Sequence, residues 1–384
     1  MTLSVEEREE LRAVVRDVLL HESPSERVRA VIDDDPGFDR TLWDRMVELG
    51  WSSIHIPAQF GGGGAGYAEL AIVLHELGRS IVPVPFLASA VLATGACLLS
   101  DRDALAGEVL ESLVAGKVLG SAALASTDGS YDPSRLTTRW ESAAGSLRLQ
   151  GAAGFVLDAD VADFLIVAAR GADATSAVVM VDTAAPGVRV ERVPTVDATR
   201  RLFTVSFADV VVGEDRMVCD PGVTADGFLA RMLAVGVIAA ACDATGAAGH
   251  VLERAAEYAK ERSQFGKPIG TFQAVKHHCA NMAIGVHASR AAASAAAAAL
   301  DGDPGDWPAR AAVASSYVGP ACSDVCALGL LVHGGIGFTW EHDSHLYLKR
   351  AKLDEVLFGT PSWHRRRLAQ TLVDRLGPTT EERL

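Results

Sequence analysis

The hydrophobic pattern of this chain changes twice along its length, and those two changes constrain the fold more than any other feature. Apolar residues recur every three to four positions from about residue 4 to 115, and again from about residue 224 to the end. Between them lie short β-rich runs broken by Gly, Asp and Pro. The first spacing is typical of amphipathic helices, and the short alternating runs are typical of strands. The sequence therefore predicts an α+β fold in which helices, strands and helices follow one another.

We predict three domains from these boundaries. They are an N-terminal helical domain (1–117), a middle antiparallel β-barrel or sandwich (118–222) and a C-terminal four-helix bundle (223–384). The last part is rich in Ala and almost continuously apolar, so we expect its helices to be buried on more than one face and to form subunit contacts. The hydrophobic share of 49% is ample for a large core.

The charge balance and the N-terminus narrow the class of protein. The formal net charge is −14, which argues against a polyanion-binding surface over the whole molecule and indicates no nucleic acid partner. Residues 1–22 are amphipathic and acidic, without the pattern of a signal or transit peptide, so we expect a cytoplasmic protein. We expect no membrane span, because no stretch reaches the roughly 20 uncharged residues that one needs. The six cysteines are widely spaced and predict no metal site.

A run of glycines, Gly61 to Gly64 with Gly66, fits the G-x-G-x-x-G pattern of dinucleotide loops. Such a loop needs a buried strand before it and a second parallel strand after the next helix. Only the short run 54–57 precedes these glycines, and helical segments follow. We therefore interpret them as a turn between helices.

The segment 258–278, YAKERSQFGKPIGTFQAVKHH, carries the strongest chemical signal. It places Arg262 and Lys267 on either side of Phe265 and a glycine, at a predicted junction between a helix and a turn. A guanidinium can hold phosphate oxygens in a fork, and a phenyl ring offers a flat face to a base or flavin ring. The same residues would also suit an ordinary helix end, where cations are favourable. The residues by themselves leave both interpretations open.

Several stretches together resemble the acyl-CoA dehydrogenase family. Residues 261–269, ERSQFGKPI, followed by Phe272-Gln273-Ala274-Val275, are similar to its E-R-x-x-F-G-x-P-I…F-Q-A-V segment. The stretches PAQFGG (57–62), HELGR (75–79), FADVVV (207–212) and GGIGFT (334–339) resemble further motifs of that family in the same order. The resemblance spans about residues 5 to 370 and implies the same α–β–α order.

The resemblance implies FAD as cofactor and an acyl-CoA thioester as substrate, within lipid metabolism. In this family a proton leaves Cα and a hydride leaves Cβ, giving a trans-2-enoyl-CoA, and electrons pass on to an electron-transfer acceptor. A tetramer, with identical or related subunits, is also implied. The matched positions for cofactor binding are Arg262, Gln264, Phe265, Gln273, Gly334, Gly335 and Thr360.

The glutamate that serves the family as catalytic base is missing at its expected position. It would directly precede Gly359-Thr360, where this chain has Phe358. A branch of the family carries its glutamate on the first long C-terminal helix, and the matching residue there is Gly236. Asp243, two turns further along that helix, is the candidate for a displaced base, and Glu355 is a weaker one. The alternative to a catalytic role is a structural one, in which Asp243 forms a hydrogen bond between helices.

Other departures affect the flavin side. The family's T-E-x-x-x-G-S-D loop is present only as STDGSYD (126–132). On the second flavin-side strand the family's aromatic residue is kept as Phe155. Its hydroxyl-bearing residue is replaced by Leu157. Shortly before the Gly-Gly pair, this chain has Leu331 where the family usually has glutamine.

These observations leave two main hypotheses. The first is an FAD-dependent acyl-CoA dehydrogenase with a displaced base, with small residues between Gly236 and Gly249 leaving room for a bulky acyl group. The second is a non-catalytic or half-site subunit of a heteromeric dehydrogenase, whose related partner chain supplies the glutamate. A weaker third is an acyl-CoA binder with other chemistry, which no further motif supports.

Overall fold

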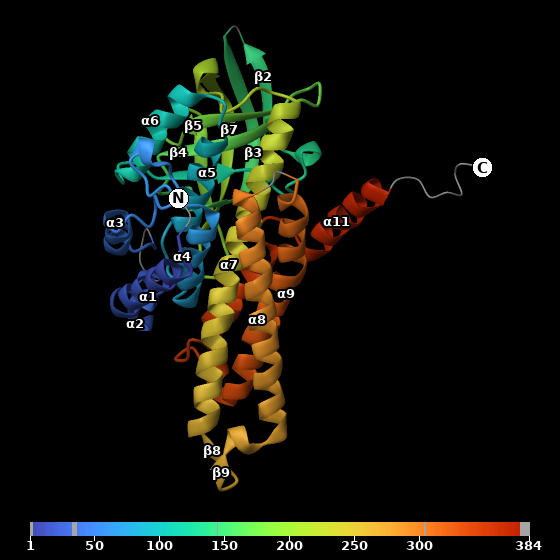
Figure 1. Ribbon diagram of the computed structural model, residues 1–384. Helices are drawn as coiled ribbons and strands as arrows, with labels where there is room; N and C mark the ends of the chain where they lie inside the picture. The colour runs from blue at the N-terminus through green and yellow to red at the C-terminus, as the bar shows by residue number, and fades with distance from the viewer. Residues whose placement is uncertain (1–2, 33–36, 144, 303–304, 377–384) are drawn as a thin grey trace, which may run out of the picture. The chain divides into compact units, whose positions relative to one another are not determined.

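The computed structural model describes residues 3–32, 37–143, 145–302 and 305–376 (Figure 1). Its contacts divide the chain into two compact units, Met1–Val73 with Val82–Gly236, and Leu74–Ile81 with Val237–Leu384. The helical, strand-rich and helical stretches follow in the predicted order. The domain boundaries after residues 117 and 222 stay predictions.

Helices dominate the first 117 residues. Ser4 begins the first of them with a capping box, in which its side chain and that of Glu7 each bond the other's backbone N–H. Their bounds are α1 (Val5–Glu22), α2 (Ser25–Ile32), α3 (Arg40–Glu48), η1 (Ala58–Phe60), α4 (Tyr67–Arg79), the π-helical η2 (Phe86–Ala93), α5 (Thr94–Leu99) and α6 (Asp103–Val114).

The glycine run is a turn before α4, as predicted, and no strand precedes it within residues 3–32 and 37–60. A Cβ added at Gly62 would lie 2.2 Å from the carbonyl oxygen of Ile56. The glycines therefore let the chain fold tightly onto itself and do not form a dinucleotide loop.

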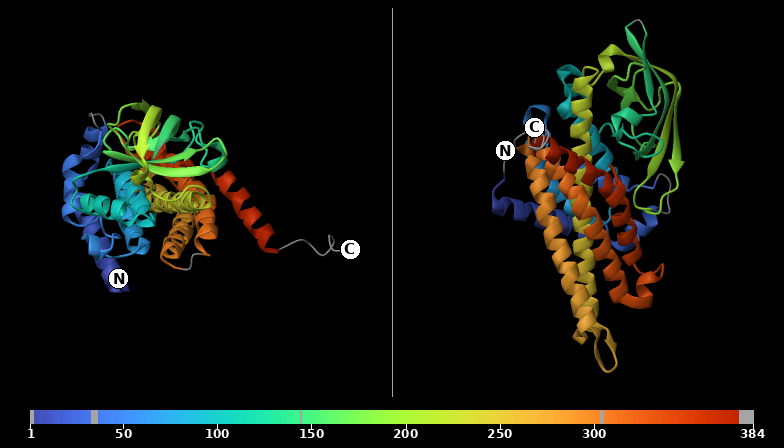
Figure 2. Two further views of the ribbon diagram at one scale, coloured as in Figure 1. Left: turned by 90° about the horizontal axis from the view of Figure 1, so that it is seen from above. Right: turned by 90° about the vertical axis from the view of Figure 1, so that its right-hand side faces the viewer.

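A single seven-stranded sheet occupies the middle of the chain, in the order β1-β4-β2-β3-β7-β6 with β5 beside β4. The strands are β1 (Gly120–Ala123), β2 (Arg139–Ala143), β3 (Ser146–Leu157), β4 (Phe164–Arg170), β5 (Ser176–Asp182), β6 (Val188–Val193) and β7 (Leu202–Gly213), with the short helical turns η3 (Pro133–Arg135) and η4 (Glu214–Arg216). Figure 2 shows the sheet as a curved layer, and η2 packs against β1.

The predicted antiparallel barrel or sandwich needs correction. β1 pairs with β4 in parallel, as does β2 at one position, so the sheet is mixed. Alternation within a strand reports which face is buried but carries no information on the direction of its neighbour. A cluster of buried Ala, Val, Leu and Phe side chains from β3, β4, β5 and β7 forms the core of this layer.

Long helices make up the C-terminal part. They are α7 (Val223–Glu261), α8 (Gln273–Asp301), α9 (Trp307–His333), α10 (Ser344–Val356) and α11 (Pro361–Leu376). A hairpin of β8 (Ser263–Gln264) and β9 (Lys267–Pro268), followed by η5 (Ile269–Thr271), joins α7 to α8, and η6 (Gly334–Phe338) follows α9. α9 packs against α8, α10 and α11, so five described helices stand where four were predicted. The hairpin forms the tip of this helical part in both figures.

Two helical segments, Val223–Glu261 and Trp307–Phe338, are long and apolar enough to cross a membrane by length and composition. Charged residues interrupt both segments, so neither is the uncharged stretch of roughly 20 residues that was sought in the sequence. The apolar window of the first is 78% buried and that of the second 50%. Such burial is what core helices of a bundle show.

Candidate functional site

The position expected to carry the base is a buried turn after α10. Phe358 is 2% exposed and has a positive φ of 66°, which is rare for a residue with a side chain. The Nε2 of His364 donates a hydrogen bond to the Phe358 carbonyl oxygen at 2.9 Å, and burial lowers the pKa of His364 to about 4. Gly359 follows with a φ of 105°, and a Cβ there would lie 2.8 Å from the Trp363 ring. The turn is held by its own neighbours and presents no acid.

Asp243 lies inside the helical unit and faces a cation. One of its carboxylate oxygens is 3.5 Å from the Nη1 of Arg350, on α10. The residues are 4% and 2% exposed. A guanidinium beside a carboxylate stabilises the ionised form and holds it in place. This geometry favours the structural interpretation of Asp243.

Gly236 and Glu355 are the other two positions considered for the base. Gly236 is buried in α7 and offers no side chain. Glu355 accepts hydrogen bonds from the hydroxyl of Ser323 at 2.6 Å and from the Nζ of Lys352 at 2.9 Å. Its carboxylate therefore joins α9 and α10.

One of the small residues of α7, Gly246, packs directly against α4. A Cβ at Gly246 would lie 1.8 Å from the carbonyl oxygen of His75, and one at Gly78 would lie 2.0 Å from that of Asp243. The glycines let the end of α4 pack directly on the backbone of α7. α4 therefore fills the room at Gly246, and an acyl cavity along the rest of Gly236–Gly249 stays a prediction.

The hairpin residues predicted to bind the cofactor are brought together and lie on the surface. Arg262, Gln264 and Gln273 are all exposed, and Phe265 is 92% exposed with a φ of 52°. The rings of Phe265 and Phe272 meet edge to face at 6.1 Å. An almost fully exposed phenylalanine beside an exposed arginine is unusual unless another molecule covers it.

The remaining predicted positions lie at two turns of the same unit. A Cβ at Gly334 or Gly335 would meet nothing within 4 Å, and Gly334 has a φ of 66°. Leu331, just before them, is 56% exposed. Thr360 is exposed, and its Oγ1 accepts from the backbone N–H of Trp363 at 3.3 Å at the start of α11.

The flavin-side loop of the sheet is closed by bonds within itself. Backbone N–H of Ser130 donates to both Asp128 Oδ1 and Ser126 Oγ at 3.1 Å. Phe155 has a φ of 54° and is 37% exposed, with its ring against Gly129. Leu157 is buried and supplies no hydroxyl.

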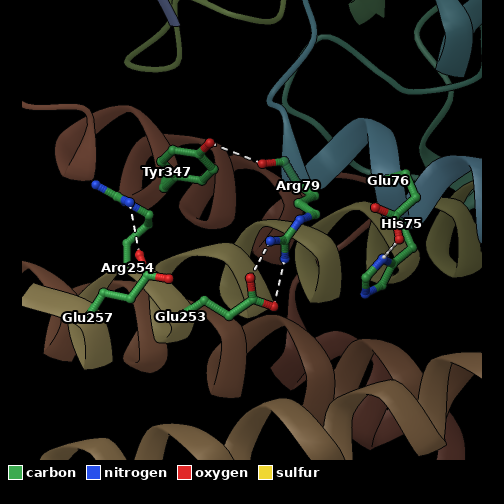
Figure 3. A network of polar contacts seen from close by, with 7 residues as sticks. All are labelled: His75, Glu76, Arg79, Glu253, Arg254, Glu257 and Tyr347. Carbon is green, nitrogen blue, oxygen red and sulfur yellow. Dashed lines mark hydrogen bonds and ion pairs between the residues drawn. The ribbon is translucent and has the colours of Figure 1, made fainter. Parts of the chain in front are cut away.

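A polar network around the end of α4, drawn in Figure 3, was not expected from the sequence. Arg79 forms an ion pair with Glu253, and the hydroxyl of Tyr347 donates to the Arg79 carbonyl oxygen at 3.0 Å. Arg254 pairs with Glu257 at 2.9 Å. The HELGR stretch was noticed only as a motif, and its partners lie about 170 and 270 residues further along the chain. Among the described residues, no group of three or more His, Cys, Asp or Glu side chains is placed to hold a metal ion.

Comparisons with known proteins identify the family. The model described as "Acyl-CoA dehydrogenase, N-terminal domain" matches residues 5–117, and "Acyl-CoA dehydrogenase, C-terminal domain" matches residues 227–373. Acyl-CoA dehydrogenase IpdE2 of Mycobacterium tuberculosis H37Rv is 33% identical over 364 residues, which are 94% of this chain and 96% of that protein. The chain belongs to the acyl-CoA dehydrogenase family.

Two solved relatives of this acyl-CoA dehydrogenase are complexes of two kinds of chain. The ChsE4–ChsE5 complex from Mycobacterium tuberculosis has a TM-score of 0.88 at 28% identity, covering 96% of this chain and 98% of the other. A variant of the Tcur3481–Tcur3483 steroid ACAD has a TM-score of 0.87 at 29% identity, covering 97% and 99%. The family comprises FAD-dependent oxidoreductases of lipid metabolism, and tetramers are typical of it.

The residues of this chain fit the adenosine diphosphate half of FAD better than the flavin half. The exposed Arg262 and Phe265 and the open backbone at Gly334 and Gly335 leave room for a phosphate-bearing ligand. The sheet-side loop, by contrast, uses its polar groups internally, and Leu157 replaces a hydroxyl.

Proposed function

We propose that this chain is a subunit without a catalytic base in a heteromeric, FAD-dependent acyl-CoA dehydrogenase. In the assembly, an acyl-CoA thioester is desaturated to the trans-2-enoyl-CoA, and a related partner chain supplies the carboxylate that takes the α-proton. The single observation that carries this proposal is the buried, left-handed Phe358 at the base position.

The two nearby acids give the proposal further support. A general base must reach the proton that it abstracts and must be able to take it up. Asp243 is in contact with the Arg350 guanidinium at 3.5 Å, and Glu355 accepts hydrogen bonds from Ser323 and Lys352. A displaced base in this chain would have to break one of these contacts first.

The chain would still contribute to cofactor binding. FAD supplies the acceptor for the hydride that leaves Cβ, and it is the chemically active group of the assembly. Arg262 would bind phosphate oxygens, Phe265 would cover a ring, and Gln264 and Gln273 would bond polar edges. The Gly334–Gly335 turn would lie close to the cofactor through its backbone, and Thr360 would cap α11 beside it.

The solved relatives suggest which partner chain and which substrate to propose for this protein. Since the ChsE4–ChsE5 and Tcur3481–Tcur3483 structures each combine two chains, we propose a hetero-tetramer with a related subunit. A steroid-derived acyl-CoA is the first substrate to test, because one of these relatives is described as a steroid ACAD. We also propose a cytoplasmic location and an electron-transfer acceptor that reoxidises the flavin.

The test compares the chain alone with the chain co-expressed with a related chain that has the family's glutamate. The visible absorption of flavin reports binding, and its bleaching by a panel of acyl-CoA thioesters reports hydride transfer. We expect little or no bleaching by the isolated chain and bleaching by the pair.

Asp243→Asn and Phe358→Leu are the matched variants of this experiment. Neither should alter bleaching by the pair, because the base lies in the partner. Bleaching by the isolated chain that Asp243→Asn abolishes, in a variant that stays folded by circular dichroism and still binds flavin, would overturn the proposal and support a dehydrogenase with a displaced base.

A further inference from the structure

The first turn of α10, residues 344–347, is capped by a histidine side chain. The backbone N–H of Ser344 donates a hydrogen bond to the Nδ1 of His342 at 3.1 Å. Asp343 stands at the N-cap position but makes no capping bond with its side chain. The first N–H groups of a helix have no partner within the helix, and Ser, Thr, Asp or Asn usually supplies one. In α10 the imidazole of His342 does so.

The direction of this hydrogen bond fixes the protonation state of His342. A backbone N–H can only donate, so the Nδ1 of His342 carries a lone pair and the ring is neutral, with its proton on Nε2. In the imidazolium form both ring nitrogens carry protons and neither can accept. Protonation therefore removes the cap. It also places a positive charge at the end of the helix where the dipole is already positive.

The His342 ring borders a cavity of about 200 Å³ in the helical unit and is surrounded by groups from α7, α9 and the start of α10. The charged and titratable residues around it are His250, Arg254, His333, Glu341, Asp343 and His345. Burial lowers the pKa of His342, and His333, whose ring lies 4.5 Å away, lowers it further. Arg254 and His345 also lower this pKa, whereas Asp343 raises it. The ring is therefore uncharged at neutral pH, where the cap is formed.

A second histidine holds the same turn from α7. The rings of His250 and Tyr347 are stacked, with their centroids 4.7 Å apart and an angle of 9° between planes. The hydroxyl of Tyr347 also donates to the Arg79 carbonyl oxygen at 3.0 Å (Figure 3). Burial lowers the pKa of His250 to about 4, with Arg79 and Arg254 acting in the same direction and Glu253 and Asp343 against it. This contact therefore persists at pH values well below neutral.

From these contacts we infer that the first turn of α10 is an acid-sensitive switch, which the neutral His342 holds closed and which opens when that ring takes up a proton. The closed turn favours the neutral ring, so the open turn binds the proton more readily. Closure is complete above the ordinary histidine pKa of about 6.5 and is lost as the pH falls toward the lower pKa of the closed turn. The His250–Tyr347 stack still holds the body of α10 while the first turn opens.

Opening of the switch would reach the segment before α10. The His345 ring, in the first turn, stacks on the ring of Trp340 with their centroids 4.7 Å apart. Trp340 follows η6, which contains the Gly334–Gly335 turn. An open first turn no longer fixes Trp340, so this turn gains freedom as well. Its consequence for FAD rests on the proposed function, whereas the switch itself does not.

Hydrogen–deuterium exchange of the full-length chain, corrected for the intrinsic effect of pH on exchange, tests the switch. Peptides that cover residues 339–350 should lose protection about five- to tenfold between pH 7.5 and 5.5, since the lower value is one unit below the ordinary histidine pKa. Peptides from the middle of α8 should keep their protection. Equal protection of residues 339–350 at both pH values would overturn the inference.

Three variants identify the group that titrates. His342→Asn keeps an acceptor for the N–H of Ser344 but takes up no proton, so its first turn should stay protected at pH 5.5. His250→Phe keeps a ring against Tyr347 and should leave the response as it is. His287→Asn, at an exposed histidine of α8, is the matched control and should also respond like the unaltered chain. A response that survives in His342→Asn, or that His250→Phe abolishes, would contradict the assignment to His342.

Flavin retention by the co-expressed pair of chains tests the consequence for the cofactor. We expect the pair to lose flavin faster at pH 5.5 than at pH 7.5, and the His342→Asn pair to lose it equally slowly at both. Equal loss at both pH values by the unaltered pair, beside an intact exchange response, would disconnect the switch from the cofactor. Should no pair form, the proposed function fails, while the exchange experiment on the chain alone still decides whether the switch exists.

Discussion

The carboxylate of Asp243 and the guanidinium of Arg350 meet inside the helical unit, 107 residues apart in the chain and both almost fully buried. The contact joins the middle of α7 to the last turns of α10, and α10 leads directly into Phe358. The acid that sequence alone offered as a base is therefore part of the framework that holds the base position.

Breaking this pair from one side should destabilise the protein strongly. Arg350→Met leaves a buried carboxylate without its cation, and we expect a loss of about 3–5 kcal/mol in the free energy of unfolding. Arg350→Met combined with Asp243→Leu should cost less than Arg350→Met alone. Urea denaturation measures both. A double variant less stable than Arg350→Met would show that the pair is not the main interaction of these side chains.

Phe358→Glu should give the chain a base of its own. A carboxylate at this position, buried and close to the reacting carbon in the family, would raise bleaching by acyl-CoA by at least about a hundredfold over the starting chain. Phe358→Gln, which has the same shape but cannot take the proton, is the control. Equal rates for the Glu and Gln variants would mean that this chain does not place its substrate near residue 358.

Gly246→Ala should disturb the crossing of α4 and α7. The new methyl would overlap the carbonyl oxygen of His75, 1.8 Å away, and overpacking of this kind costs about 1–3 kcal/mol or more. Gly249→Ala, on the same helix, meets its nearest atom at 3.6 Å and should be neutral or slightly stabilising. Thermal melts of the two variants compare them directly. A stable Gly246→Ala protein would indicate that α4 moves away from α7 easily.

His55 should make stability depend on pH. It is fully buried, and burial lowers its pKa to about 4 from an unfolded value of about 6.5. The unfolded chain therefore binds a proton below pH 6.5 that the folded chain does not. Its stabilising contribution is complete above pH 6.5 and falls as the pH drops toward 4, by up to about 1.4 kcal/mol per pH unit.

The measurement for this prediction is urea denaturation between pH 4 and 7. His55→Phe should flatten the dependence, whereas His21→Phe, at an exposed histidine of α1, should not. A slope unchanged by His55→Phe would assign the pH dependence to other groups.

Arg262→Met and Phe265→Ser should reduce retention of FAD without affecting the fold. Because both side chains are exposed, the free energy of unfolding should change by less than about 0.5 kcal/mol. Lys260→Met removes a neighbouring exposed charge and should leave retention intact. Gel filtration of the co-expressed pair, with flavin absorbance as the readout, tests this. Full flavin occupancy in both variants would remove the hairpin from the cofactor site.

The sequence by itself determined the order of helices and strands, the turn at the glycine run, the family, and the absence of a carboxylate at residues 236 and 358. These features depend on local periodicity and on residue identity, and both are present in the linear chain. The tertiary structure alone decided that β1 runs parallel to β4, that Arg350 holds Asp243, and that α4 fills the space along Gly246. It also brought His250, His333 and Asp343 around one cavity. Burial, ion pairing and strand direction depend on which distant segments meet, and no local pattern carries that information.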